Sequence, residues 1–173
     1  MYTRLNFATL TLVDALDLAV LVEVEAHNRY RKFAALLGTR FAGDAASVFT
    51  SMAENEAKHG RELEERRKAM FGDTPVRVSL DDLFDVEAPE EGAPRANMSA
   101  LRAFEIALSS EQKAFAFYQE ALPHVTDPEI HALFTELRDE ETEHIRMVRE
   151  AIANLPPGAD EELDLDKDES PFL

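Results

Sequence analysis

Residues 56–59 and 141–144 share the form Glu-x-x-His, and this pairing of a carboxylate with an imidazole is the strongest chemical signal in the sequence. Positions i and i+3 of an α-helix lie on one face, so both side chains of a motif can bind the same ion. One such motif is weak evidence, because helices contain many Glu and His residues by chance. Two copies at a constant offset (141 − 56 = 85), flanked by matching apolar positions, are specific. We interpret them as the halves of a two-metal site.

A second pair of segments repeats in the same way and supplies two further carboxylates. Both segments follow the pattern A-x₃-E-x₂-A-x₃-Y, at an offset of 88 (111 − 23 = 88). The chain is therefore predicted to be a tandem duplication of a helix pair, in which each pair carries two Glu and one His. The candidate metal ligands are Glu23, Glu56, His59, Glu111, Glu141 and His144.

These six residues occupy core-facing positions at which Leu or Phe would be the structural choice. Four carboxylates buried close together are strongly unfavourable unless positive charge compensates them. The same faces carry no Lys or Arg at that level, whereas two divalent cations would balance four carboxylates and leave both histidines neutral. Carboxylate and imidazole ligands without thiolate, in a two-fold pattern, are typical of di-iron or di-manganese sites in helical bundles. The alternative is a buried polar layer held by ion pairs or hydrogen bonds, without metal.

Tyr30 and Tyr118 follow Glu23 and Glu111 by seven residues, which is two turns along the same helix face. Three roles are open for them at this point. They are core aromatics, or they take part in redox chemistry, or their hydroxyls orient a ligating carboxylate on a neighbouring helix.

The remaining histidines have weaker claims on the site. His27 lies four residues after Glu23 and could border the site, but its repeat partner is Phe115, so the duplication does not support it as a ligand. His124 and His131 are expected on the surface.

Four helices are needed to position these residues, and the sequence marks their ends. Thr11, Asp44 and Asp127 are expected N-caps, the last followed by Pro at the first helical position, and Gly38 is an expected C-cap. The third helix is expected to start near residue 97 or 99. The helices are predicted over residues 12–37, 45–71, 97–122 and 128–154.

Residues 73–97 contain three prolines and an acidic patch, and a linker of this length is uncommon in a compact domain unless it crosses the fold. Such a crossover would let the second and third helices run parallel. We expect one domain over residues 1–157, followed by a mobile acidic tail, residues 158–173, with seven acids against one Lys.

The composition excludes several classes of function. The net charge of −17 argues against nucleic acid or an anionic membrane as a partner. The absence of Cys excludes disulfides, thiolate zinc sites and iron–sulfur clusters. The first apolar run is interrupted by Asp14 and Asp17, so neither a signal peptide nor a membrane span is predicted, and a cytoplasmic location is expected.

On these motifs, residues 12–154 resemble the ferritin-like superfamily, and within it the rubrerythrin-like and bacterioferritin-like proteins. The resemblance implies an all-α, antiparallel four-helix bundle with a long crossover between the second and third helices. It also implies a centre of two Fe ions that reacts with hydrogen peroxide or O₂. By the same resemblance Glu56 and Glu141 are bridging ligands, whereas Glu23 and Glu111 are terminal ones.

The chain also departs from these families. Ala114 stands where rubrerythrins usually carry an additional Glu, and without Cys there is no rubredoxin module, so a separate electron-donor protein is expected. Ala57 stands where bacterioferritins place a haem-binding Met, so no haem is expected. The tail does not resemble the fifth helix of cage-forming ferritins.

Three functional hypotheses follow. The first is a di-iron oxidoreductase acting on peroxide or O₂, expected as a homodimer in which the crossover could exchange helix pairs between subunits. The second is iron storage or iron delivery of the ferritin type. The third is a di-manganese site, as in a catalase, or a non-catalytic bundle.

Overall fold

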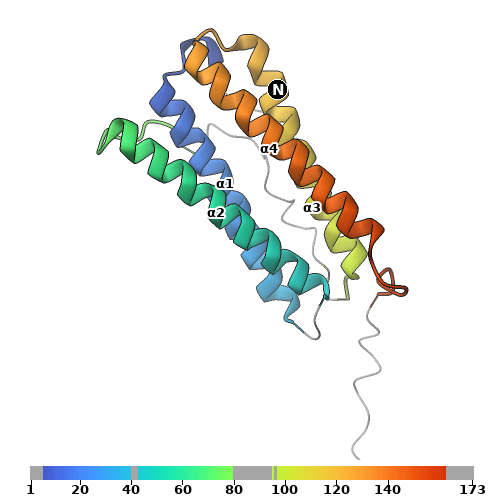
Figure 1. The fold of residues 1–173 in the computed structure, drawn as a ribbon. Coiled ribbons are helices and arrows are strands. Elements are labelled where there is room, and N and C mark those ends of the chain that lie inside the picture. Colours follow the sequence, from blue (N-terminus) through green and yellow to red (C-terminus); the bar gives the residue numbers. More distant parts are fainter. Residues whose placement is uncertain (1–5, 40–42, 80–94, 96, 163–173) are drawn as a thin grey trace, which may run out of the picture.

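The computed structural model describes residues 6–39, 43–79, 95 and 97–162, and these residues form a bundle of four long helices (Figure 1). The predicted all-α fold with four helices is confirmed, and the described residues contain no strand. Two 3₁₀ turns, η1 (Phe7–Thr9) and η3 (Leu122–His124), flank the long elements. The long helices are α1 (Leu12–Leu37), α2 (Ala45–Phe71), α3 (Ala100–Ala121) and α4 (Pro128–Ala153).

Each long helix begins where a side chain caps its first backbone N–H groups. The cap of α3 is Ser99, whose hydroxyl accepts a hydrogen bond from the Arg102 amide at 3.2 Å. Asp127 accepts from two amides of α4, at 2.8 and 3.2 Å. The C-terminal ends of α1 and α2 are Gly38 and Gly72, with φ of 66° and 57°, a conformation that other residues adopt only with strain. Thr11 and Asp44 cap α1 and α2.

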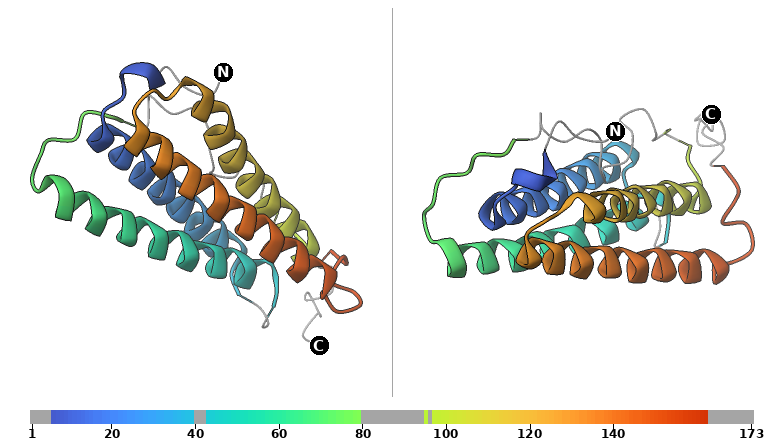
Figure 2. Two further views of the ribbon diagram at one scale, coloured as in Figure 1. Left: turned by 45° about the horizontal axis from the view of Figure 1, so that its top comes forward. Right: turned by 90° about the horizontal axis from the view of Figure 1, so that it is seen from above.

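The helices are arranged as two antiparallel pairs, α1 with α2 and α3 with α4 (Figures 1 and 2). The α2 and α3 helices run in the same direction, as expected for a chain that crosses the length of the bundle between them. Most of that crossover, residues 80–94 and 96, lies outside the described residues. None of the described helices is long and apolar enough to cross a membrane.

The apolar core consists of two clusters. One joins the first half of α1 to the second half of α3 and the first half of α4, and it includes Leu16, Phe117 and Phe134. The other surrounds Phe33 and Phe49 at the opposite end of the bundle. Burial of each large side chain contributes about 1.5–3 kcal/mol, so both clusters hold the helices in register. The candidate ligands occupy the helix segments between the two clusters.

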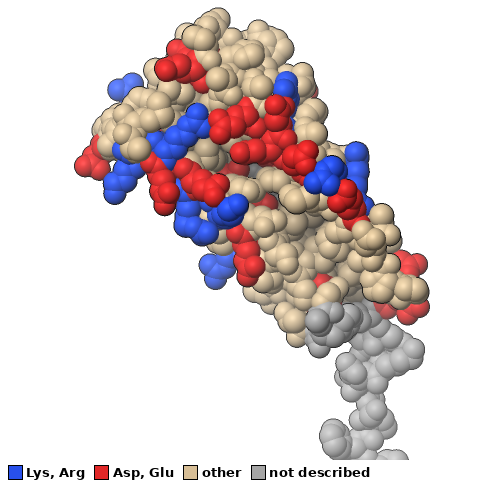
Figure 3. All heavy atoms as spheres, viewed as in Figure 1, with Lys and Arg blue, Asp and Glu red and all other residues tan. Residues whose placement is uncertain are grey.

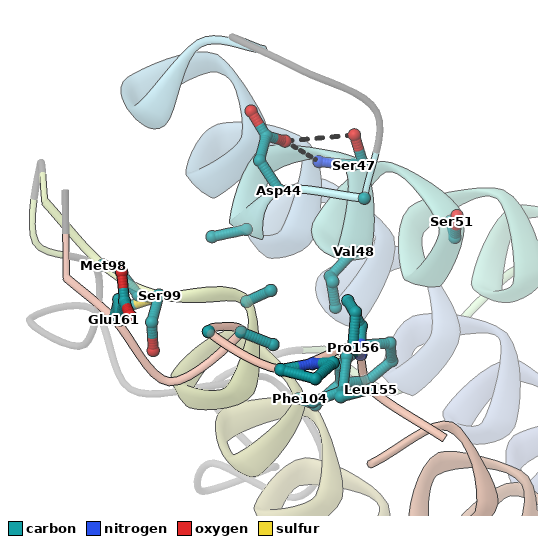
Figure 4. Close-up of a pocket in the computed structure, with 16 residues that line it drawn as sticks. Asp44, Ser47, Val48, Ser51, Met98, Ser99, Phe104, Leu155, Pro156 and Glu161 are labelled. Atoms are coloured by element: carbon teal, nitrogen blue, oxygen red, sulfur yellow. Dashed lines mark hydrogen bonds between the residues drawn. The ribbon is translucent and has the colours of Figure 1, made fainter. Parts of the chain in front are cut away.

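Residues that follow α4 close one end of the bundle. The Leu101 amide donates to the carbonyl of Ala159 at 3.0 Å, and the Asn97 side chain donates to Glu162 at 2.8 Å. Together with the first turns of α2 and α3, they surround a largely apolar cavity of about 520 Å³, lined among others by Val48 and Phe104 (Figure 4). We expected the tail, residues 158–173, to be mobile. Its first part, residues 158–162, lies against the start of α3. Residues 163–173 lie outside the described residues.

Candidate metal centre

The middle turns of all four helices bring the six candidate side chains into one layer. Their donor atoms form two groups of three, and the atoms of each group lie within 4.8 Å of one another. The first group is Glu23 of α1 with Glu56 and His59 of α2, and the second is Glu111 of α3 with Glu141 and His144 of α4. Each helix pair thus builds one group, as the duplication predicts.

The four carboxylates are deeply buried. Glu23, Glu56, Glu111 and Glu141 are exposed by 3, 1, 0 and 2%. The side chains of His59 and His144 are more accessible, at 19 and 12%, and their rings stack at a centroid distance of 4.7 Å and an angle of 7°. The layer is therefore closed on its carboxylate side and opens to solvent past the two imidazoles.

The two groups differ in their internal contacts. The Nδ1 atom of His144 forms a hydrogen bond with Glu111 at 3.2 Å and has a longer contact of 3.4 Å with Glu141. The Nδ1 atom of His59 is 3.9 Å from Glu56, which is too far for a hydrogen bond. The duplication therefore does not produce two equivalent half-sites.

Burial and mutual repulsion determine the protonation of the layer when no cation is present. Burial, together with the charge of Glu56, raises the pKa of Glu23 well above its ordinary value. Burial likewise raises the pKa of Glu111, although its hydrogen bond with His144 opposes the shift. Burial alone would lower the pKa of His144, but its close contacts with the carboxylates of Glu111 and Glu141 outweigh burial and raise that pKa to about 11. In the metal-free chain, bound protons therefore supply charge compensation that a cation would otherwise provide.

The residues present fit a pair of metal ions. Several buried donor atoms have no hydrogen-bond partner: one oxygen each of Glu23, Glu111 and Glu141, both oxygens of Glu56, and Nδ1 of His59. Among the described residues, no Lys or Arg forms an ion pair with any of the four glutamates. Unsatisfied buried carboxylates are costly, and bound cations would satisfy them. The set of carboxylate and imidazole ligands without thiolate matches iron or manganese.

The two tyrosines lie on opposite sides of this layer. Tyr30 belongs to the cluster around Phe49, with which it stacks at a ring distance of 6.0 Å. Tyr118 belongs to the other cluster and meets Phe134 edge-on at 5.5 Å. Both are fully buried, so their packing agrees with a core role, and the roles in redox chemistry and ligand orientation stay predictions.

The other residues considered from the sequence lie outside the two groups. His27 donates from Nδ1 to the carbonyl of Ala53 at 2.7 Å, and His124 and His131 are exposed. Glu140 is exposed at the histidine side, where burial raises its pKa and the imidazoles of His59 and His144 oppose the shift.

Two neighbours of the site were not found from the sequence. Gly60 is buried, and a Cβ there would lie 3.4 Å from the Cβ of Glu23, so α2 lies close to α1 beside a candidate ligand. Ser110, next to Glu111, is 1% exposed, and its hydroxyl has no hydrogen-bond partner. Its repeat partner is Val22 (110 − 88 = 22), and this polar exception at an apolar position was the available signal.

Comparison with known proteins agrees with this geometry. A family model described as Rubrerythrin matches residues 14–152, which include all six candidate ligands. The chain belongs to the rubrerythrin family. This confirms the resemblance inferred from the repeated motifs, and membership of the rubrerythrin family together with the two carboxylate and histidine groups indicates a metal-binding site.

Solved structures show the same fold. The chain is 27% identical to an uncharacterised conserved protein from Magnetospirillum magnetotacticum MS-1, with a TM-score of 0.66 over 85% of this chain and 97% of that one. A hypothetical protein from Pyrococcus furiosus is 22% identical, with a TM-score of 0.52 over 83% of this chain and 89% of that one, and it supports the fold alone. No curated protein matches the chain.

Proposed function

We propose that this member of the rubrerythrin family is a non-haem di-iron oxidoreductase that oxidises a pair of Fe(II) ions with hydrogen peroxide or O₂. The observation that carries the proposal is the buried layer itself, in which four carboxylates and two imidazoles face each other without a compensating Lys or Arg among the described residues. Two divalent ions would balance the four negative charges, and the membership of the rubrerythrin family favours iron.

Each group of three residues would bind one of the two ions. Glu23, Glu56 and His59 would hold one ion, and the second group of three would hold the other. When bound, two ferrous ions supply two electrons, the number needed to reduce one hydrogen peroxide to water. The apolar clusters on both sides keep bulk water from the carboxylate side, so a small oxidant has its shortest approach past the partly exposed histidines.

The surface around that opening supports cation uptake. On the face shown in Figure 3, acidic side chains gather along the seam between α2 and α4, and basic side chains flank them. An ion pair among the described residues crosses the seam, from Arg66 of α2 to Glu136 of α4 at 2.8 Å. A negative field at an opening raises the local concentration of cations. Electrons for a further cycle would come from a separate donor protein.

Anaerobic titration of the metal-free chain with Fe(II), followed by rapid mixing with peroxide or O₂, tests the proposal. We expect two equivalents to bind per chain and at least one oxidant to react rapidly with the loaded protein. Glu141→Ala should reduce the stoichiometry, whereas Glu143→Gln, an exposed change two residues further along α4, should not. Unchanged stoichiometry in Glu141→Ala would show that the ligands are assigned wrongly.

Two further measurements separate the alternatives. Metal analysis of protein purified without added metal distinguishes iron from manganese. The mass in solution distinguishes a small oligomer, which we expect, from a cage that stores iron.

A further inference from the structure

A groove between α1 and α2 lies outside the metal layer and has a different chemical character. Its volume is about 470 Å³, and it is lined by His27 and Arg31 of α1 and by Thr50, Glu54 and Arg61 of α2, with alanines between them. Both arginines are exposed, whereas the histidine is partly buried. None of these residues belongs to the two groups of candidate metal ligands.

The two arginines of this groove have no carboxylate partner, a property that they share with Arg77, Arg95 and Arg149 among the described arginines. In the part of the chain that the structure describes, neither Arg31 nor Arg61 forms an ion pair with an acidic residue. Six other arginines do so, at distances between 2.6 and 3.2 Å. Arg31 and Arg61 are distinguished by their position, because two unpaired guanidinium groups from neighbouring helices line one groove in a chain of net charge −17. Glu54 is the single acidic residue of the lining, so the groove is positive overall.

His27 adds a defined hydrogen-bonding group to the same groove. Its Nδ1 lies 2.7 Å from the carbonyl oxygen of Ala53, and a carbonyl only accepts, so Nδ1 carries the hydrogen. In the neutral ring the other nitrogen, Nε2, is then a hydrogen-bond acceptor. The groove thus combines two cationic donors with one neutral acceptor.

The second helix pair shows that this combination does not follow from the duplication. The repeat partner of His27 is Phe115, and that of Arg31 is Gln119. The partner of Arg61 is Arg146, which binds Glu143 and Glu150 at 2.8 and 2.6 Å and is therefore neutralised. The groove between α3 and α4 is lined by Phe115 and Ile145, and its two arginines, Arg146 and Arg149, are balanced by Glu143 and Glu150 in the same lining. The same backbone scaffold carries an anion-binding set of side chains only in the first pair.

We propose that the α1–α2 groove binds one phosphate-type oxyanion, either inorganic phosphate or the phosphoryl group of a small monoester. Arg31 and Arg61 would donate charge-assisted hydrogen bonds to its oxygens, and Nε2 of His27 would accept from a protonated oxygen. Phosphate carries such a proton near neutral pH and sulfate does not, so the groove selects phosphate over sulfate.

Calorimetric titration of the full chain, with the metals that it carries, tests this inference in a buffer free of phosphate. Inorganic phosphate should bind at one site per chain. Arg31→Gln and Arg61→Gln should each weaken binding about tenfold, because each removes one charge-assisted hydrogen bond. Arg102→Gln is the matched control, since this arginine pairs with Glu105 on the surface of α3. His27→Phe, which installs the residue found in the second repeat, should lower the affinity for phosphate to that for sulfate.

The outcomes separate the groove from the metal centre. Phosphate that binds to metal would keep its affinity in both arginine variants, and that result would overturn the inference, as would the absence of saturable binding. An equal loss of phosphate affinity in Arg102→Gln would show that general surface charge causes the effect, and this result would also overturn the inference. Glycerol phosphate provides the second arm: its binding supports recognition of a monoester, and its exclusion alongside phosphate binding supports a site for the free ion.

Discussion

Replacement of Glu56 by Gln should change the stability of the metal-free and metal-loaded protein in opposite directions. The side chain is 1% exposed, and neither of its oxygens has a hydrogen-bond partner. Its charge is the largest cause, after burial, of the raised pKa of Glu23, and it also raises that of Glu111. Gln keeps the shape and removes the charge, and its amide can donate to a neighbouring carboxylate.

The size of the effect follows from the separation of the charges. Donor atoms of Glu23 and Glu56 lie within 4.8 Å, and two unit charges at that distance repel by about 3 kcal/mol at an effective dielectric constant near 20. Protonation already relieves part of this repulsion in the wild-type chain. We therefore expect the metal-free variant to be more stable by about 1–2 kcal/mol. For a chain of this length, this corresponds to a rise in Tm of about 2–8 °C.

Metal should stabilise the wild type much more than the variant. Metal at 100 times its dissociation constant adds about 2.7 kcal/mol per site, and loss of an anionic ligand removes much of that gain. Thermal unfolding followed by circular dichroism, in chelator and in anaerobic Fe(II), measures both effects. Glu64→Gln, an exposed change on the same helix, is the control and should leave both melting temperatures unchanged. A Glu56→Gln protein that melts lower than wild type in chelator, yet keeps the metal-induced rise, would refute the reasoning.

Three other predictions concern stability. The pKa of His144 rises from 6.5 to about 11 on folding, so between these pH values the metal-free folded protein holds a proton that the unfolded chain has lost. The free energy of unfolding should therefore fall as the pH rises through this range, by up to about 1.4 kcal/mol per pH unit. A melting temperature in chelator that increases with pH would contradict this. Arg67→Met should lower the melting temperature more than Arg66→Met, because Arg67 binds the buried Asp17 at 2.6 Å and the carbonyl of Gly72 at 2.7 Å; equal losses would contradict it. Gly60→Ala should raise the free energy of unfolding by about 0.5–1 kcal/mol, since Ala favours the helix and the added Cβ makes an ordinary contact. Chemical denaturation measures this free energy. A lower value in the variant would show that the site does not tolerate a Cβ.

Local physical chemistry explains why most of the fold could be predicted. A capping side chain acts on amides two or three residues away, so Asp44 and Asp127 marked helix starts without knowledge of the tertiary structure. The six candidate ligands could be recognised for a similar reason. An ionisable residue at a core-facing position is costly, and six such residues in a repeated pattern require a common explanation.

Features that depend on contacts between helices were not predictable in this way. The unequal distances of His59 and His144 from their carboxylates arise from small differences in how each pair packs. The buried ion pair between Asp17 and Arg67 joins residues 50 positions apart, and neither residue shows a local pattern that announces its partner. The position of the turn after α4 was also not predictable from local sequence, because it depends on a hydrogen bond from Leu101 of α3.

The duplication itself explains where such specialised features arise. The four carboxylates of the buried layer share one charge balance with the ions that they would bind. A change of ligand in one repeat alone would therefore disturb the charge balance of both half-sites. Both repeats accordingly present the same ligand types. On the outer faces no such coupling exists, and the two pairs differ in charge, as His27 and Arg31 differ from Phe115 and Gln119. Agreement between the repeats therefore points to the shared metal chemistry. Disagreement between them points to what each helix pair does alone, and the net positive lining of the α1–α2 groove, against a balanced lining between α3 and α4, is such a difference.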